Sequence, residues 1–150
     1  THFDRIEGYL EDAKELGATV AVGGGTDRNN GFIAPTVLCD VSMDSLVMKE
    51  EIFGPLASII KVGDFEEAIT TANDTDFGLS SAICTSSLYN AREFKRRSEA
   101  GMAMVNLPTA GVDYHVPFGG RKNSSYGSRE QGRAAIDFYT TTKTTYSFSG

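Results

Sequence analysis

The chain has 150 residues, of which 40% are hydrophobic and 23% charged, a composition typical of a globular domain with a buried core. Its formal net charge of −6 opposes contact with a phosphate backbone, which argues against a nucleic-acid partner. No apolar run approaches the roughly 20 residues of a membrane span, so a membrane partner is not expected either. The two cysteines, Cys39 and Cys84, are too few for a disulfide framework or a zinc site, and they indicate a reduced, cytoplasmic protein without a structural metal.

The first third of the chain predicts a helix followed by strands. Apolar residues recur at three- and four-residue steps over 3–16, which indicates an amphipathic helix that Gly17 ends. Residues 18–22 then form a short apolar strand, and residues 32–39 a second extended segment. The three glycines between them lack the spacing and the following helix of a phosphate-binding loop, so a small nucleotide-binding protein is the weakest hypothesis.

From residue 56 onward, strands and helices alternate. The pattern predicts strands at 56–62, 80–85 and 102–106 and helices at 64–73 and 87–100. This alternation is typical of an α/β domain with a mostly parallel sheet.

The last part of the chain is irregular before it becomes regular again. Residues 107–128 are rich in Gly, Pro, Ser and Tyr, and a loop of that length in a compact domain is usually functional or disordered. A short helix is expected at 129–137. Residues 138–150 are dense in β-branched and aromatic types, so we expect a C-terminal strand that needs a neighbour, which another subunit could supply.

Two motifs carry a resemblance to a known family. The first is Glu-Glu-Ile-Phe-Gly-Pro at 50–55; the second is Pro-Phe-Gly-Gly-x-Lys at 117–122, followed by Arg129 and Glu130. Flanking pieces agree: Ala-Pro-Thr-Val at 34–37, Asn73 ahead of Gly-Leu-Ser at 78–80, and Gly101 ahead of Val-Asn at 105–106. In this order, over essentially the whole chain, they resemble the aldehyde dehydrogenase superfamily.

The resemblance implies a fold and a chemistry. The fold would be three-layer α/β: about half of the family's catalytic domain at 1–137, and a C-terminal oligomerisation strand at 138–150. In the family a cysteine thiolate attacks the aldehyde, a hydride passes to NAD or NADP, and water releases the carboxylate. The family's nucleophile, general-base glutamate and cofactor domain have no match in this chain. We therefore expect no catalytic residue here, no aldehyde oxidation by these residues alone, and the N-terminal part of the same enzyme as a partner.

The resemblance assigns cofactor-binding residues to the first motif. Glu51 matches the glutamate that accepts hydrogen bonds from the nicotinamide ribose, a role that suits an acceptor-only carboxylate. Phe53 matches the aromatic residue beside the nicotinamide ring. Without the family, Glu51 would be taken for a solvent-exposed loop acid and Phe53 for a core aromatic.

The second motif contains a possible proton relay, Glu130, whose ordinary explanation is an acid in the first turn of a helix. The sequence departs from the family just before it. One residue is inserted between Lys122 and Arg129, and a glycine of the common pattern is Ser125, so the register at Glu130 is open.

The irregular loop resembles the substrate tunnel of the family. The wall of this tunnel is matched by Asn106, His115 and Phe118. The amino-acid sequence of the loop is similar to that of the 2-oxoglutarate semialdehyde (2,5-dioxopentanoate) dehydrogenase branch. His115 either contacts an acidic substrate or is satisfied by backbone groups. The resemblance implies a small-molecule aldehyde substrate and a homo-oligomer. The alternative to part of an enzyme is a standalone interaction module that pairs with a full-length dehydrogenase subunit through residues 138–150.

Overall fold

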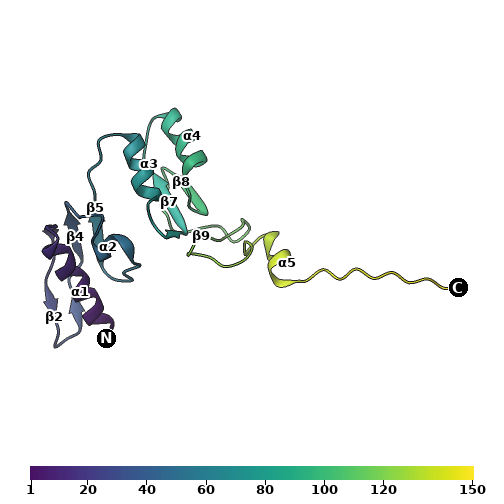
Figure 1. The fold of residues 1–150 in the computed structure, drawn as a ribbon, viewed down its shortest axis with the longest axis horizontal. Helices are drawn as coiled ribbons and strands as arrows, with labels where there is room; N and C mark the ends of the chain where they lie inside the picture. Colours follow the sequence, from purple (N-terminus) through teal and green to yellow (C-terminus); the bar gives the residue numbers. More distant parts are fainter. The chain divides into compact units, whose positions relative to one another are not determined.

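A computed structural model describes residues 1–150, which divide into two compact units, Thr1–Asp64 and Phe65–Gly150 (Figure 1). The boundary falls inside the portion 1–137 that the sequence suggested as one body. The first unit contains α1 (His2–Glu15), β1 (Thr19–Val22), β2 (Thr26–Asp27), β3 (Phe32–Ile33), β4 (Thr36–Cys39), α2 (Leu46–Lys49) and β5 (Leu56–Ile59). The second contains α3 (Phe65–Asn73), β6 (Phe77–Gly78), β7 (Ser80–Ile83), α4 (Leu88–Arg97), β8 (Met102–Val105), β9 (Arg121–Lys122) and α5 (Ala134–Tyr139). No helix combines the length and apolarity that a membrane crossing requires.

The core of the first unit lies under helix α1. The Thr1 side chain accepts the Asp4 N–H in a capping box, which begins the helix. The apolar stripe predicted from spacing is buried, with Ile6, Leu10 and Ala13 each at most 3% exposed. The sheet has the order β1-β4-β5, in which β4 pairs with β5 in parallel and with β1 antiparallel. Leu38 of the central strand is fully buried in this core.

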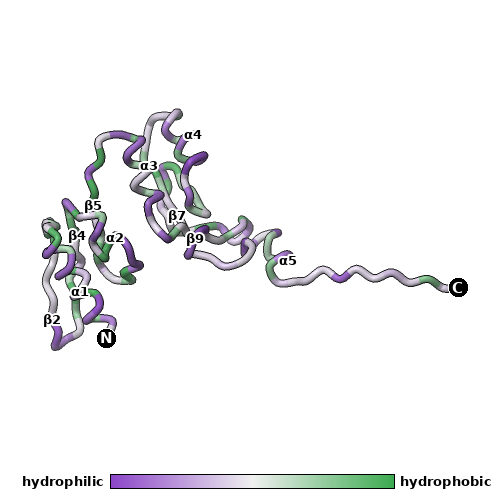
Figure 2. The backbone as a smooth tube through the Cα atoms, viewed as in Figure 1, coloured by the Kyte–Doolittle hydropathy of each residue, from purple (hydrophilic) through white to green (hydrophobic).

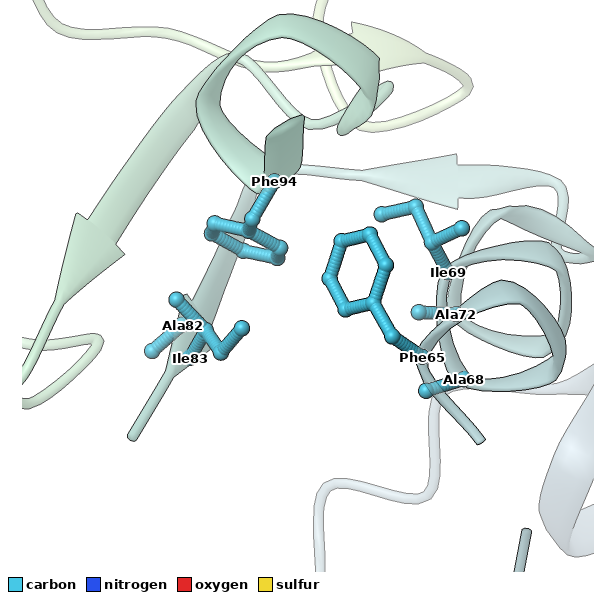
Figure 3. A pocket seen from close by; sticks show the side chains of 7 residues that line it. All are labelled: Phe65, Ala68, Ile69, Ala72, Ala82, Ile83 and Phe94. Atoms are coloured by element: carbon cyan, nitrogen blue, oxygen red, sulfur yellow. The ribbon is translucent and has the colours of Figure 1, made fainter. Parts of the chain in front are cut away.

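The second unit is built around a parallel strand pair joined by a helix. Strands β7 and β8 pair in parallel, with Ser80 opposite Met102, and α4 makes the crossover that parallel strands require. A cavity of about 110 Å³ lies between α3, α4 and β7. Its walls are only apolar, and Figure 3 shows Phe65 and Ile69 of α3 facing Phe94 of α4, with Ala82 and Ile83 of β7 beside them.

The expected α/β class is confirmed, with two differences of detail. Only β4–β5 and β7–β8 pair in parallel, in separate sheets, and the pairs β1–β4, β2–β3 and β6–β9 are antiparallel. The strand expected at 138–150 is not formed within a single chain. Phe138 and Tyr139 belong to α5, and residues 140–150 are exposed and pair with no strand, although the tube of Figure 2 turns hydrophobic near the C-terminus. A strand needs a neighbour, so its pairing with another subunit stays a prediction.

The packing around Phe94 gives a stability prediction. Phe94 is 4% exposed and holds α4 against β7 and α3. Phe94→Ala should lower the free energy of unfolding by about 3–5 kcal/mol, because it enlarges an existing cavity. Leu88→Ala on the same helix, at a side chain 89% exposed, should change it by less than about 0.5 kcal/mol. Urea unfolding of both variants checks this; equal losses would contradict the packing described.

Candidate functional site

The first motif forms a loop whose side chains alternate between inward and outward directions. Glu50 faces helix α1, where its carboxylate accepts a 2.6 Å hydrogen bond from the Tyr9 hydroxyl. Ile52 packs against the core, and a Cβ on Gly54 would lie 2.5 Å from the Ile6 side chain, so glycine permits the close approach. Glu51 and Phe53 lie between these anchors and point away, both exposed, Phe53 by 75%.

The backbone of this loop is strained at Phe53. Its φ of 49° lies in the left-handed region, which costs a non-glycine residue about 1–3 kcal/mol. Helix α1 holds the two carbonyl groups around it: His2 donates through Nε2 to the Phe53 oxygen at 2.7 Å, and Arg5 donates to the Ile52 oxygen at 3.2 Å. Backbone strain of this kind clusters at functional sites, so the loop is a candidate for one.

Glu51 fits a partner with hydroxyl groups. Its carboxylate makes no hydrogen bond or ion pair within the chain, so all of its acceptor sites are available. The fit to the ribose of NAD or NADP therefore rests on an exposed acceptor whose neighbours Glu50 and Ile52 are both anchored. The exposed Phe53 ring stands two residues away in the same loop.

The second motif brings Glu130 next to Phe118. The two residues form an antiparallel bridge, with N–H to carbonyl distances of 2.7 and 2.9 Å. Arg129 donates to the Gly120 carbonyl, and Gly132 lies so near the His115 carbonyl that a Cβ there would be 2.4 Å away. The loop before Phe118 and the segment after Arg129 are thus fixed to each other, while the Glu130 side chain stays exposed.

The inserted residue and the serine that replaces a family glycine are both accommodated. The Ser125 hydroxyl accepts the Gly120 N–H at 2.6 Å, and the neighbouring Ser124 hydroxyl accepts the Gly78 N–H at 2.9 Å. These bonds close the turn between Lys122 and Arg129. The structure therefore places Glu130 opposite Phe118 despite the altered spacing.

Asn106 and His115 have different surroundings. The Asn106 amide accepts from the Thr85 N–H at 2.8 Å and donates to the Thr85 carbonyl at 3.0 Å, and its φ of 55° turns the chain out of β8. Asn106 thus positions the start of the 107–118 loop. His115 is exposed and its ring meets the Tyr114 ring edge-on at 5.5 Å; no side-chain hydrogen bond to backbone, the ordinary explanation for this histidine, is found.

Several other motif residues hold the second unit together. The Lys122 ammonium donates to the Asn73 and Thr75 carbonyls at the end of α3, at 2.5 and 2.9 Å, and pairs with Glu99 at 2.7 Å. A Cβ on Gly101 would lie 2.0 Å from the Gly119 carbonyl oxygen. The backbone before β8 can therefore approach Gly119 this closely only because residue 101 has no side chain. Packing therefore explains why the motifs contain Lys122, Gly101 and Gly119.

The sequence interpretation missed Tyr9, Arg5 and His2, which shape the first motif from α1. They form a stripe beside the apolar one, at spacings of three and four residues. That spacing was visible, but their partners lie more than 40 residues away in sequence. The sequence offered no signal for that pairing.

Comparison with known proteins decides the family. The aldehyde dehydrogenase family model matches residues 1–145. The chain belongs to the aldehyde dehydrogenase family. It is 44% identical over 144 residues to the alpha-ketoglutarate semialdehyde dehydrogenase of Haloferax volcanii, covering 92% of this chain and 30% of that protein. It is 40% identical over 148 residues to the alpha-ketoglutaric semialdehyde dehydrogenase of Bacillus subtilis, covering 95% of this chain and 30% of that protein.

A solved aldehyde dehydrogenase shares the fold. The Mycobacterium tuberculosis aldehyde dehydrogenase complexed with NAD⁺ superposes with a TM-score of 0.84 at 34% identity, over 93% of this chain and 29% of that one. This aldehyde dehydrogenase chain thus spans about 30% of the length of the relatives it matches. The resemblance inferred from the two motifs is confirmed.

The segment that leads into the first motif gives a pH prediction. Asp12 of α1 accepts from the Ser45 hydroxyl at 2.6 Å and from the Leu46 N–H at 2.8 Å, and these bonds lower the pKa of Asp12. Because the folded pKa lies below the unfolded value of about 3.9, the stabilisation is complete above that value and is lost as the pH falls through the folded pKa. Asp12→Asn should therefore lower the urea midpoint at about pH 7, and less so at about pH 3.

Glu11→Gln is the matched control, since Glu11 is an exposed acid of the same helix. Its midpoint should follow the wild type at both pH values. A destabilisation by Asp12→Asn that does not depend on pH would contradict the role given to the ionised carboxylate.

Proposed function

We propose that this chain is the part of an NAD(P)-dependent aldehyde dehydrogenase that contacts the nicotinamide half of the cofactor and lines the substrate site. The reaction of the whole enzyme would be oxidation of a semialdehyde to a carboxylate. The observation that carries the proposal is the loop at 50–54, in which Glu51 and Phe53 are exposed while the residues between and beside them are anchored.

Each exposed residue has a task in binding. Glu51 accepts hydrogen bonds from the two hydroxyls of the nicotinamide ribose, and charge-assisted bonds of this kind contribute about 1.5–3 kcal/mol each. Phe53 lies against the nicotinamide ring and restricts its orientation. A nicotinamide cofactor held by these residues would supply the acceptor for the hydride that leaves the substrate carbon.

The second motif would serve the substrate side. Glu130 is a candidate for relaying the proton released on hydrolysis, because its backbone is held opposite Phe118 by the bridge and its carboxylate is exposed. Phe118 and His115 belong to the loop that would form the tunnel wall, and Asn106 holds the start of that loop on Thr85. The exposed His115 suits contact with the carboxylate of a semialdehyde.

The names of two relatives support the substrate class. The Haloferax volcanii and Bacillus subtilis proteins are both named as alpha-ketoglutarate (ketoglutaric) semialdehyde dehydrogenases. The sequence of the loop at 107–118 resembles the same class of enzyme. Both thiols, Cys39 and Cys84, are free, which suits the cytoplasmic location inferred from the sequence. Neither matches the family's nucleophile, so we expect the purified chain alone to form no NAD(P)H.

A second role, as an interaction module, is favoured by the C-terminal segment. Residues 140–150 are exposed and unpaired, and their β-branched and aromatic composition suits addition to the sheet of another subunit. In the enzyme this would produce a homo-oligomer. As an isolated chain it would pair with a full-length dehydrogenase, and deletion of 140–150 would abolish co-purification.

A chimera tests the proposed function. In it, this chain replaces the matching 148-residue stretch of the Bacillus subtilis relative. We expect NAD(P)H formation with a semialdehyde substrate. Glu51→Gln should raise the KM for the cofactor about tenfold or more, because the charge-assisted bonds to the ribose are weakened.

Glu11→Gln, an exposed acid on α1, is the control and should leave the KM unchanged. A chimera that folds and assembles like its parent yet forms no NAD(P)H would overturn the proposal. So would a Glu51→Gln variant whose kinetics match the control.

A further inference from the structure

We propose that helix α1 is the template for the cofactor-facing loop and that Tyr9 is its main positioning residue, an inference that rests on the proposed function. Four polar side chains of the helix recur at steps of three, four and three residues, which places them on one stripe of a 3.6-residue helix. They are His2, Arg5, Tyr9 and Asp12. None of them matched a family motif in the sequence.

The stripe contacts the segment 45–53 in reverse order. Asp12 binds Ser45 and Leu46 at the start of α2, and Tyr9 binds Glu50. Arg5 and His2 then bind the carbonyls of Ile52 and Phe53. One face of one helix therefore sets the path of the chain from the start of α2 to the strained residue.

Tyr9 distinguishes the two adjacent glutamates. Its ring is 3% exposed, so its hydroxyl has a fixed position in the core, and the 2.6 Å bond draws the Glu50 carboxylate inward. The hydrogen bond to Glu50, followed by burial, raises the pKa of Tyr9. With Glu50 tied to the helix, the alternation of an extended segment directs Glu51 outward.

The template also explains how the strain at Phe53 is maintained. A left-handed non-glycine residue persists only where its surroundings over-determine it. Here the surroundings are the two carbonyl contacts from His2 and Arg5, the Tyr9–Glu50 bond and the Gly54 contact with Ile6. Loss of the Tyr9 hydroxyl should release Glu50 and let the loop relax without unfolding the helix.

Nuclear magnetic resonance of the full 150-residue chain tests this with two readouts. The first is the set of backbone amide signals of Glu51, Phe53 and Gly54, which report the loop conformation. The second is the dissociation constant for NAD⁺ from titration. Tyr9→Phe should shift these amide signals and weaken NAD⁺ binding roughly three- to tenfold, the effect of one net hydrogen bond. Thr26→Val, which removes a different hydrogen bond to α1 through Glu7, should change neither.

Changes at Glu50 keep the test decisive if Tyr9→Phe does not fold. Glu50 is exposed, so Glu50→Ala should leave the fold intact and reproduce the shifts, whereas Glu50→Gln retains an acceptor and should restore most of the wild-type signals. Loop signals of Tyr9→Phe and Glu50→Ala that coincide with wild type would overturn the inference. If NAD⁺ perturbs no wild-type signal of this chain, which has no match to the family's cofactor domain, the amide signals alone decide the role of Tyr9, and the chimera decides the proposed function.

Discussion

The hydrogen bond between the Tyr9 hydroxyl and the Glu50 carboxylate joins a buried helix to a motif more than 40 residues away, and we propose that the arrangement of the loop at 50–54 depends on it. The tyrosine can hold this position because the apolar stripe of α1 is packed under the sheet. The buried core thus acts on the exposed site through a short chain of contacts: core to helix, helix to Glu50, Glu50 to the direction of Glu51. Of two adjacent glutamates, Glu50 is held against the helix, whereas Glu51 is left exposed at the position that we propose binds the cofactor.

In the second unit, close contacts between backbone segments hold the motif in place. Gly101 lies against Gly119 and Gly120, and Gly132 lies against the His115 carbonyl, at distances that exclude a Cβ. Lys122 then closes the end of α3 with its ammonium group. These contacts place Glu130 opposite Phe118 without direct help from either side chain. The glycines of the second motif are accordingly structural, and the residues proposed to act on substrate lie between them.

Much of this organisation could be predicted from the sequence. The apolar periodicity of α1, the alternation of strands and helices and the two motifs depend on local spacing and on family resemblance, so each was visible in the chain itself. The polar stripe of α1 could not be interpreted, because its meaning comes from partners at 45–53. The hydrogen bonds between the Asn106 amide and Thr85 could not be predicted either, because they depend on the register of β7 and β8; its place on the tunnel wall stays a prediction. The C-terminal segment shows the same principle, since a strand depends on a neighbour that a single chain does not supply.

The most direct test of the whole account is a nuclear Overhauser measurement between NAD⁺ and the aromatic rings of the chimera with the Bacillus subtilis relative, in which Phe53 is assigned through Phe53→Leu. The account predicts cross-relaxation from the nicotinamide and its ribose to the Phe53 ring, reduced by Glu51→Gln. Contacts to Phe32, another exposed ring of the first unit, in place of Phe53 would contradict it, as would the absence of any contact at millimolar cofactor.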